Sequence, residues 1–294
     1  MKRMLSSGAL KLTFNKITNK CHGKIQSAQS PMVILHGLFG NANNNRSMAN
    51  DILALENERQ PSMYRDIYLV NMRNHGTSPR CLSMTYEDMS LDVIKFVTGH
   101  GLIQPVLLGH SMGGKAAMET VLKQPSLASK MVVIENAPVA QPINTKFIEY
   151  IGMLESICAD PGVQTLTQAR EKLQSIERDP MVSGFLLTML QRGTSATGKG
   201  LVSRLPLDTL KDALEAGSIS AWADHGHLQY SGPCLFLKGS RSRYLQEDRD
   251  LAAIQRHFPR SAVEAIAGAG HFVNAERPRE CAAAVTRFLA SRRG

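Results

Sequence analysis

The sequence predicts an α/β fold in which a mostly parallel central sheet carries helices on both faces. Two observations lead to this prediction. Short apolar runs that are typical of buried strands alternate with segments of helical periodicity over most of the 294 residues. One long stretch between two of the strands departs from this alternation and has helical periodicity alone. Strands that alternate with helices favour a parallel sheet.

The predicted strands are short apolar runs, some of which end in glycine. Five of them are expected to form the sheet: 31–37, 66–72, 105–111, 130–136 and 233–239. A shorter strand is expected near 262–267. Residues 12–18 alternate well enough between apolar and polar types to pair as a first strand.

Helices are predicted after several of these strands. Thr85 is expected to be the N-cap of a helix with the sequence YEDMSLDVIKFV. A helix with the sequence MGGKAAMETVLKQ follows the strand at 105–111 directly. Two further helices are expected near 247–257 and 277–291.

The stretch from about 140 to 230 is predicted to be a helical lid. It contains four successive helical segments: FIEYIGMLESI, LTQAREKLQSI, PMVSGFLLTML and LDTLKDALEAG. An insertion at this point of a parallel sheet lies over the carboxyl ends of the strands, which is where ligands bind. We therefore expect a lid on one α/β domain that spans residues 11–294, and not a second domain.

The positive charge of the chain is concentrated at its N-terminus. The formal net charge is +9, yet residues 1–50 hold seven basic residues and no carboxylate, so the remainder is nearly balanced. Residues 1–10 are expected to be a targeting leader, because basic, hydroxylated and spaced apolar residues without acids are typical of transit peptides. This predicts a mitochondrial protein, with the matrix as its compartment. The alternative is a cytoplasmic protein whose basic segment is its first strand.

The remaining composition excludes several classes of protein. No run of 18 apolar residues exists, which excludes a transmembrane helix. The near-balanced charge of residues 51–294 and an aromatic content of 5% argue against a nucleic-acid partner. The five cysteines are scattered, and the sequence has no CxxC pair and no His/Cys cluster, so we expect neither a disulfide framework nor a metal. No cofactor is predicted.

One segment imitates a cofactor motif. Residues 193–200 nearly match a phosphate-binding P-loop, but Gly200 replaces the Ser/Thr that binds Mg²⁺ and no buried strand precedes the segment. We expect it to be a loop of the lid.

The strongest functional signal is the G-x-S-x-G motif at residues 109–113. It lies between a predicted strand and a predicted helix, where a serine nucleophile needs a tight, strained turn with small neighbours. The turn would expose Ser111 at the edge of the sheet, and the start of the helix would direct N–H groups toward a developing negative charge. Ser111 is therefore the predicted nucleophile.

The predicted base is His271. It follows the last strand on a glycine-rich loop, AGAGHF, late in the chain, which gives the order Ser, acid, His. The predicted oxyanion donors are the N–H groups of Leu38 and Met112, because a glycine turn at 36–40 can bring the first beside the second.

The acid that orients the histidine is predicted to be Glu135. Many serine hydrolases carry the acid in a G-x-x-D turn after the strand at 233–239, but the sequence there is Gly239-Ser-Arg-Ser242, without a carboxylate. Glu135 ends the strand that follows the nucleophile helix, so its carboxylate would reach the same edge of the sheet. Three other carboxylates remain as alternatives: Asp208, Glu247 and Asp248.

Five segments together resemble one subgroup of the α/β-hydrolase superfamily. They are HGLFGN (36–41), MRNHGTSP (72–79), YEDMSLDV (86–93), GHSMGGKAAM (109–118) and GAGHFVNAERP (268–278). The subgroup holds the mitochondrial abhydrolase-domain-11 proteins, small bacterial esterases and the yeast ethanol acetyltransferases. The resemblance implies a Ser-His-acid hydrolase whose acid comes 24 residues after the serine, which is the position of Glu135.

The sequence departs from the subgroup at two positions. The subgroup typically has Asp where this chain has Glu135, and it usually has Asp where this chain has Asn71. The second position lies off the triad, so we expect it to affect loop packing only. The polar residues at 73–76 are likewise expected to tie neighbouring loops together by hydrogen bonds.

The predicted function is that of a serine hydrolase that cleaves carboxylic esters or thioesters through an acyl-enzyme on Ser111. Two alternatives remain. The same triad could transfer the acyl group to an alcohol, as in ester synthesis by an ethanol acetyltransferase. The chain could also be a binding protein with a hydrolase fold and no catalysis. The sequence does not identify protein partners.

Overall fold

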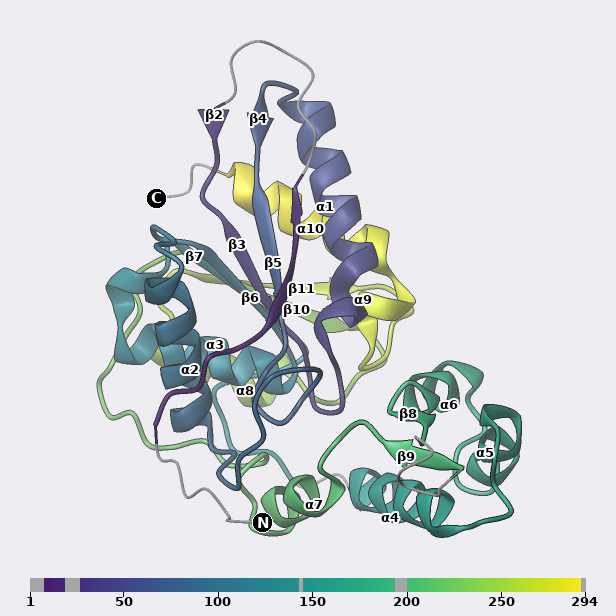
Figure 1. The fold of residues 1–294 in the computed structure, drawn as a ribbon. Coiled ribbons are helices and arrows are strands. Elements are labelled where there is room, and N and C mark those ends of the chain that lie inside the picture. The colour runs from purple at the N-terminus through teal and green to yellow at the C-terminus, as the bar shows by residue number, and fades with distance from the viewer. Residues whose placement is uncertain (1–7, 19–26, 143–144, 194–199, 292–294) are drawn as a thin grey trace.

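The central feature of the computed structural model, which describes residues 8–18, 27–142, 145–193 and 200–291, is a seven-stranded sheet (Figure 1). Its strand order is β1-β5-β3-β6-β7-β10-β11. The edge strand β1 pairs antiparallel with β5, and the other neighbours are parallel. The strands are β1 (Phe14–Thr18), β3 (Met32–Leu35), β5 (Asp66–Val70), β6 (Val106–His110), β7 (Lys130–Ile134), β10 (Cys234–Gly239) and β11 (Ser261–Ile266). The predicted fold class is confirmed.

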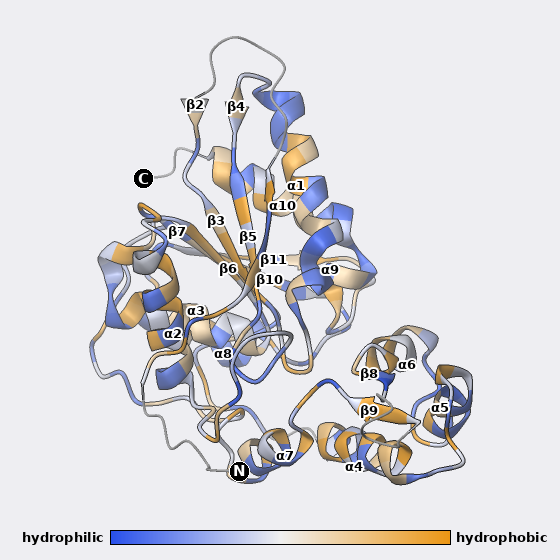
Figure 2. Cartoon of the chain, in the orientation of Figure 1, coloured by the Kyte–Doolittle hydropathy of each residue, from blue (hydrophilic) through white to orange (hydrophobic). Residues whose placement is uncertain are grey.

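Helices cover both faces of this sheet (Figure 1). One face packs against α1 (Arg46–Arg59) and α10 (Pro278–Ala290), and the other against α2 (Tyr86–Gly99), α3 (Met112–Lys123) and α8 (Glu247–His257). The strand side chains alternate between the two cores: Val33 and Leu35 enter one, whereas Met32 and Ile34 enter the other. The apolar runs are continuous because both faces of a parallel sheet are buried. Figure 2 shows these strands as predominantly hydrophobic.

Local signals placed several helix boundaries correctly. Thr85 is the N-cap of α2, and its hydroxyl accepts a hydrogen bond of 3.1 Å from the Asp88 N–H. The helix expected near 247–257 is α8. The helix α1 was not predicted, because its few apolar residues are interrupted by polar ones.

The stretch after β7 forms the predicted helical lid. Its helices are α4 (Thr145–Ala159), α5 (Leu166–Leu173), α6 (Pro180–Leu187) and α7 (Leu207–Glu215). A hairpin of β8 (Leu190–Arg192) and β9 (Leu201–Ser203), which was not predicted, lies between α6 and α7. The inner residues of the P-loop-like segment, 194–199, lie outside the described residues. Buried lid residues such as Ile151 and Leu210 belong to the same hydrophobic cluster as the face covered by α2 and α3.

Small elements complete the described chain. A short parallel pair joins β2 (Ser27–Ala28) and β4 (Met63–Tyr64), and α9 (Val273–Glu276) precedes α10. Single 3₁₀ turns span Ala42–Asn45 and Pro125–Leu127.

Candidate active site

Ser111 occupies the turn between β6 and α3, which is the strand–turn–helix context that the motif predicts. Its backbone has φ 52° and ψ −117°, a left-handed conformation that is strained for a residue with a side chain. The turn is held from both sides. The Ser111 N–H donates to the carbonyl of Ile134 on β7 at 2.8 Å, and the Ser111 carbonyl accepts from the N–H of Gly114 at 2.9 Å.

The two glycines of the motif allow this turn to pack tightly. A Cβ on Gly109 would lie 2.1 Å from the carbonyl oxygen of Gly113. A Cβ on Gly113 would lie 2.4 Å from the carbonyl oxygen of Leu35 on β3. Neither position has room for a methyl group, so the start of α3 lies directly against two strands.

Glu135 and His271 meet at the same edge of the sheet. The side chain of Glu135 follows β7 and is fully buried. One carboxylate oxygen accepts the N–H of Gly239, and the other accepts the hydroxyl of Ser242. The second oxygen also lies 3.1 Å from Nδ1 of His271. Of the four carboxylates considered from the sequence, Glu135 is the one that the structure pairs with His271.

The three alternative carboxylates lie elsewhere. Asp208 begins α7 in the lid and lines a surface hollow between α4 and β9. Glu247 and Asp248 are exposed in the first turn of α8, where Glu247 lies 3.7 Å from the amine of Lys238.

Two further residues shape the histidine's surroundings, and neither was predicted from the sequence. Ser242 holds the position that a G-x-x-D turn would give to the acid, and its hydroxyl donates to Glu135 instead. The ring of Tyr244 stacks on the His271 ring with centroids 3.8 Å apart. The spacing Gly239-x-x-Ser242 could have identified the serine. No sequence pattern indicates the stacking, which depends on how this loop folds over the site.

Burial shifts the pKa values of this pair in opposite directions. It raises the pKa of Glu135 to about 7, although the hydrogen bonds from Ser242 and Gly239 lower it. Burial lowers the pKa of His271 to about 4, although the charge of Glu276 raises it by a smaller amount. A neutral His271 that donates Nδ1–H to Glu135 keeps its Nε2 atom as an acceptor.

Two buried histidines hold the loop that carries Leu38. Nε2 of His36 accepts the N–H of Met72 at 3.0 Å, and Nε2 of His75 accepts the N–H of Phe39 at 3.1 Å. Burial lowers the pKa of His36 to about 4 and that of His75 to about 3, so both rings stay neutral acceptors. The loop from 36 to 40 is thereby fixed beside the Ser111 turn.

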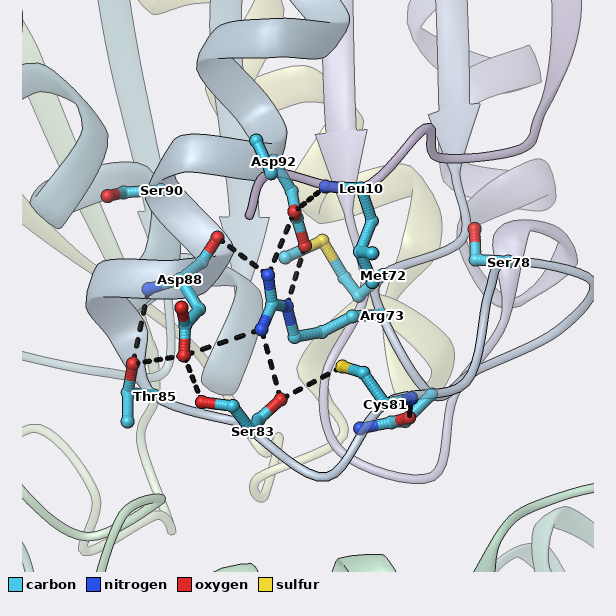
Figure 3. A network of polar contacts seen from close by, with 12 residues as sticks. Leu10, Met72, Arg73, Ser78, Cys81, Ser83, Thr85, Asp88, Ser90 and Asp92 are labelled. Atoms are coloured by element: carbon cyan, nitrogen blue, oxygen red, sulfur yellow. Dashed lines mark hydrogen bonds and ion pairs between the residues drawn. The ribbon is translucent and has the colours of Figure 1, made fainter. Parts of the chain in front are cut away.

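The segment at 72–83 is in turn anchored by Arg73, as Figure 3 shows. The guanidinium is fully buried and makes two hydrogen bonds to Asp92, of 2.7 and 2.9 Å. It also donates to the carbonyls of Ser83 and Asp88. The residues at 73–76 therefore tie loops together.

Asn71 has the same kind of role. Its side-chain oxygen accepts the N–H of Ala42 at 2.8 Å, and its side-chain amide donates to the hydroxyl of Thr13 at 2.9 Å. The Asn71 side chain thus connects the first strand region to the turn before α1, away from the histidine–glutamate pair.

Two cavities border Ser111. The first is lined by Ser111, His271 and three aromatic rings: Phe147, Phe185 and Phe272. The second is lined by Ser111, Met112 and Lys115 together with lid residues such as Leu214. Phe147 and Phe185 belong to the lid helices α4 and α6, so the lid covers the site as predicted.

Leu38 lines both cavities next to Ser111. Met112 is the first residue of α3, so its N–H has no acceptor within the helix. The residues of the two predicted oxyanion donors, Leu38 and Met112, thus line the second cavity together with Ser111.

Three further features of the described residues concern metal binding, membrane-spanning helices and disulfides. In the described part of the chain, no group of three or more His, Cys, Asp or Glu could hold a metal ion, and no helix is long and apolar enough to span a membrane. No disulfide joins the cysteines of these residues, and Cys21 lies outside them.

A family model described as the alpha/beta hydrolase fold matches residues 30–278. The chain belongs to the α/β-hydrolase family. A "Probable alcohol acetyltransferase" of Saccharomyces cerevisiae is 43% identical over 271 residues, which cover 88% of this chain and 77% of that protein. The mouse "sn-1-specific diacylglycerol lipase ABHD11" is 34% identical over 262 residues. The matched residues cover 88% of this chain and 80% of that protein.

Among solved structures, this α/β-hydrolase resembles a "Marine microorganism esterase". The TM-score is 0.80 at 29% identity, with 95% of this chain and all of that chain covered. The predicted subgroup is confirmed, and the lipases, esterases and acetyltransferases among its relatives are consistent with an ester-processing hydrolase or acyltransferase.

The packing of Gly113 yields a stability prediction for this α/β-hydrolase. Gly113→Ala is expected to lower the free energy of unfolding by about 1–3 kcal/mol, because its methyl group overlaps the carbonyl of Leu35. The matched control is Gly152→Ala in α4, where a Cβ would meet nothing within 4 Å and the better helix former is expected to raise stability by up to about 1 kcal/mol. Urea unfolding of both variants measures the difference. Equal effects would contradict the packing argument.

Proposed function

We propose that the protein is a serine hydrolase that cleaves carboxylic esters or thioesters. The observation that supports this most is the His271–Glu135 pair, whose histidine lines the same cavity as a serine in a strained strand-to-helix turn. In hydrolases of this fold, such a constellation activates the serine hydroxyl for attack on a carbonyl carbon.

The proposed reaction proceeds in two halves. Nε2 of His271 takes the Ser111 proton as the serine oxygen bonds to the carbonyl carbon, and the N–H groups of Leu38 and Met112 stabilise the oxyanion. The tetrahedral intermediate collapses, and His271 returns the proton to the departing alcohol or thiol. Water then attacks the acyl-enzyme with His271 as base, which releases the acid and restores Ser111. Throughout, Glu135 holds Nδ1–H and stabilises the imidazolium that forms transiently.

Replacement of Ser111 tests the proposal directly. We expect Ser111→Ala to lower kcat for p-nitrophenyl acetate or butyrate by about 10⁴-fold or more, since the nucleophile and its base act as a unit. The control is Ser129→Ala, at a half-buried serine before β7, which should retain wild-type turnover. A fluorophosphonate probe should label the wild type and the control but not Ser111→Ala. Unchanged ester turnover in Ser111→Ala would refute the mechanism.

Replacement of the acid tests the role of Glu135. In Glu135→Gln the side-chain oxygen is expected to remain on the Gly239 N–H, which turns the amide N–H groups toward Ser242 and His271. The amide would then donate to Nδ1 and place the ring proton on Nε2, where it blocks uptake of the serine proton. We expect kcat to fall by about 10³- to 10⁴-fold.

Asp208→Asn is the matched control for this experiment, because Asp208 was the lid alternative and lies in a separate hollow. It should leave kcat unchanged. A small effect of Glu135→Gln with a large effect of Asp208→Asn would show that the assignment of the acid is wrong.

A second candidate function is acyl transfer to an alcohol, and the 43% identity with the yeast probable alcohol acetyltransferase favours it. The two reactions share the acyl-enzyme and differ in what attacks it. With p-nitrophenyl acetate and increasing ethanol, we expect free acetate to remain the main product of this chain. Gas chromatography of acetate and ethyl acetate distinguishes hydrolysis from acyl transfer. A predominance of ethyl acetate at millimolar ethanol would make the protein an acyltransferase. A protein that neither turns over esters nor reacts with the fluorophosphonate would be a non-catalytic binding protein.

We also propose mitochondrial targeting by the N-terminal leader. The carbonyl of Ala9 accepts a hydrogen bond from Lys95, and the Leu10 N–H donates to Asp92, so the chain is attached to α2 from Ala9 onward. Processing would then stop before Ala9. A fluorescent fusion of the full chain is expected in mitochondria, and the same fusion without residues 1–7 in the cytosol. Mitochondrial import of the shortened fusion would contradict the leader.

A further inference from the structure

The two cavities beside Ser111 can be assigned to the two halves of an ester. His271 lines the first cavity, and the proposed mechanism requires it to protonate the leaving group. The leaving alcohol or thiol therefore belongs in the first cavity. The acyl group is therefore assigned to the second cavity, which is lined by Leu38 and Met112 but not by His271.

The second cavity contains a buried cation, the ammonium of Lys115. Lys115 lies one helical turn after Ser111 on α3, on the side of the helix that faces this cavity, and the residue is 1% exposed. Its Nζ donates to the carbonyls of Ser220 and Ala221, each at 3.0 Å, and lies 5.3 Å from the centre of the Tyr86 ring. Ser220 and Tyr86 also line the cavity, so the charged end of Lys115 is in its wall.

The charge of Lys115 has no counterion in the described part of the chain. Within residues 8–18, 27–142, 145–193 and 200–291, no ion pair of 4 Å or less joins it to a carboxylate. Burial lowers the pKa of Lys115 to about 8, and no acidic group acts against this shift. The amine still carries its charge at neutral pH. A buried charge without a partner is costly, and two carbonyl dipoles offset the cost only in part.

An anchoring role alone does not require a charge. The carbonyls of Ser220 and Ala221 belong to the segment that leaves the lid, and a neutral donor would also hold them. A cation that borders a ligand cavity next to the nucleophile is instead matched by an anion that arrives with the substrate.

We propose that the second cavity takes an acyl group whose far end carries a carboxylate, and that Lys115 binds this carboxylate. The substrate class is thus a half-ester or half-thioester of a short dicarboxylic acid. Because Lys115 is only one turn from Ser111, a chain such as succinyl or glutaryl fits the separation. This inference rests on the proposed hydrolase function and specifies the acyl half of its substrate.

The test compares two ethyl esters that differ in one charge. Monoethyl succinate has a terminal carboxylate, and ethyl succinamate has a neutral amide of nearly the same size. Ethanol release is measured for both. We expect kcat/KM of the wild type to be about tenfold or more higher for monoethyl succinate, as for a charge-assisted hydrogen bond. In Lys115→Met this ratio is expected to fall to about one or below.

Controls separate this inference from folding and from the proposed function. Lys123→Met, near the end of the same helix, should keep the wild-type ratio, because Lys123 pairs with Glu87 away from the cavity. Thermal unfolding reports whether Lys115→Met is folded. Inhibition of the wild type by succinamate, which has one carboxylate, and by the neutral diamide succinamide needs no variant, and succinamate is expected to bind at least about tenfold more tightly.

Each outcome decides a different question. If the wild type cleaves the amide ester as well as the acid ester, and succinamate inhibits no better than succinamide, Lys115 does not bind a carboxylate although the hydrolase function stands. An equal loss of both activities in Lys115→Met, with the wild-type ratio preserved, would likewise overturn the inference. If the wild type cleaves neither these esters nor p-nitrophenyl esters, the proposed function itself fails.

Discussion

The site depends on a set of backbone hydrogen bonds that continue the sheet past the carboxyl ends of its strands. The Ser111 N–H bonds to the carbonyl of Ile134, the Glu135 N–H to that of Leu237, and the Ser240 N–H to that of Ile266, at 2.8, 2.8 and 3.0 Å. Each of these bonds joins the residue after one strand to the neighbouring strand. As a result, the serine, the glutamate and the loop with Ser242 reach one edge of the sheet in a fixed order. The left-handed φ values of Ser111 and Glu135 then turn both residues out of the strand direction.

The sequence was informative wherever structure follows from local pattern. Ser111, Glu135 and His271 could be predicted to lie close together because each follows a predicted strand, and parallel strands bring their carboxyl ends to one edge. The N-cap at Thr85 and the extent of α8 follow from nearest neighbours in the same way. Ser242 also follows a predicted strand, and its spacing from Gly239 is a local signal for it. Tyr244 could not be predicted, because its stacking on His271 depends on how the loop between β10 and α8 folds over the site. The helix α1 was missed because its burial depends on α10, from the other end of the chain.

The buried histidines show why residue type alone does not reveal a role. His36, His75 and His110 are more deeply buried than the reactive candidate His271, and burial lowers the pKa of all four. His36 and His75 use Nε2 to accept a backbone N–H, whereas Nε2 of His110 lies 2.9 Å from the carbonyl of His271 and donates to it. His271 differs in one respect, since its Nδ1 is bound to a carboxylate. That difference arises in tertiary structure and cannot be deduced from a histidine's neighbours in sequence.

The lid supplies Phe147 and Phe185 to the wall of the first cavity, whereas Ser111, Glu135 and His271 all follow strands. The groups that would carry out the reaction and these two aromatic rings of the leaving-group cavity are therefore encoded in separate parts of the gene. Substitutions in α4 and α6 can remodel that space while the backbone hydrogen bonds at the sheet edge stay intact. Evolution can thus change the accepted alcohol or thiol in small steps, each of which leaves a working set of reactive groups in place.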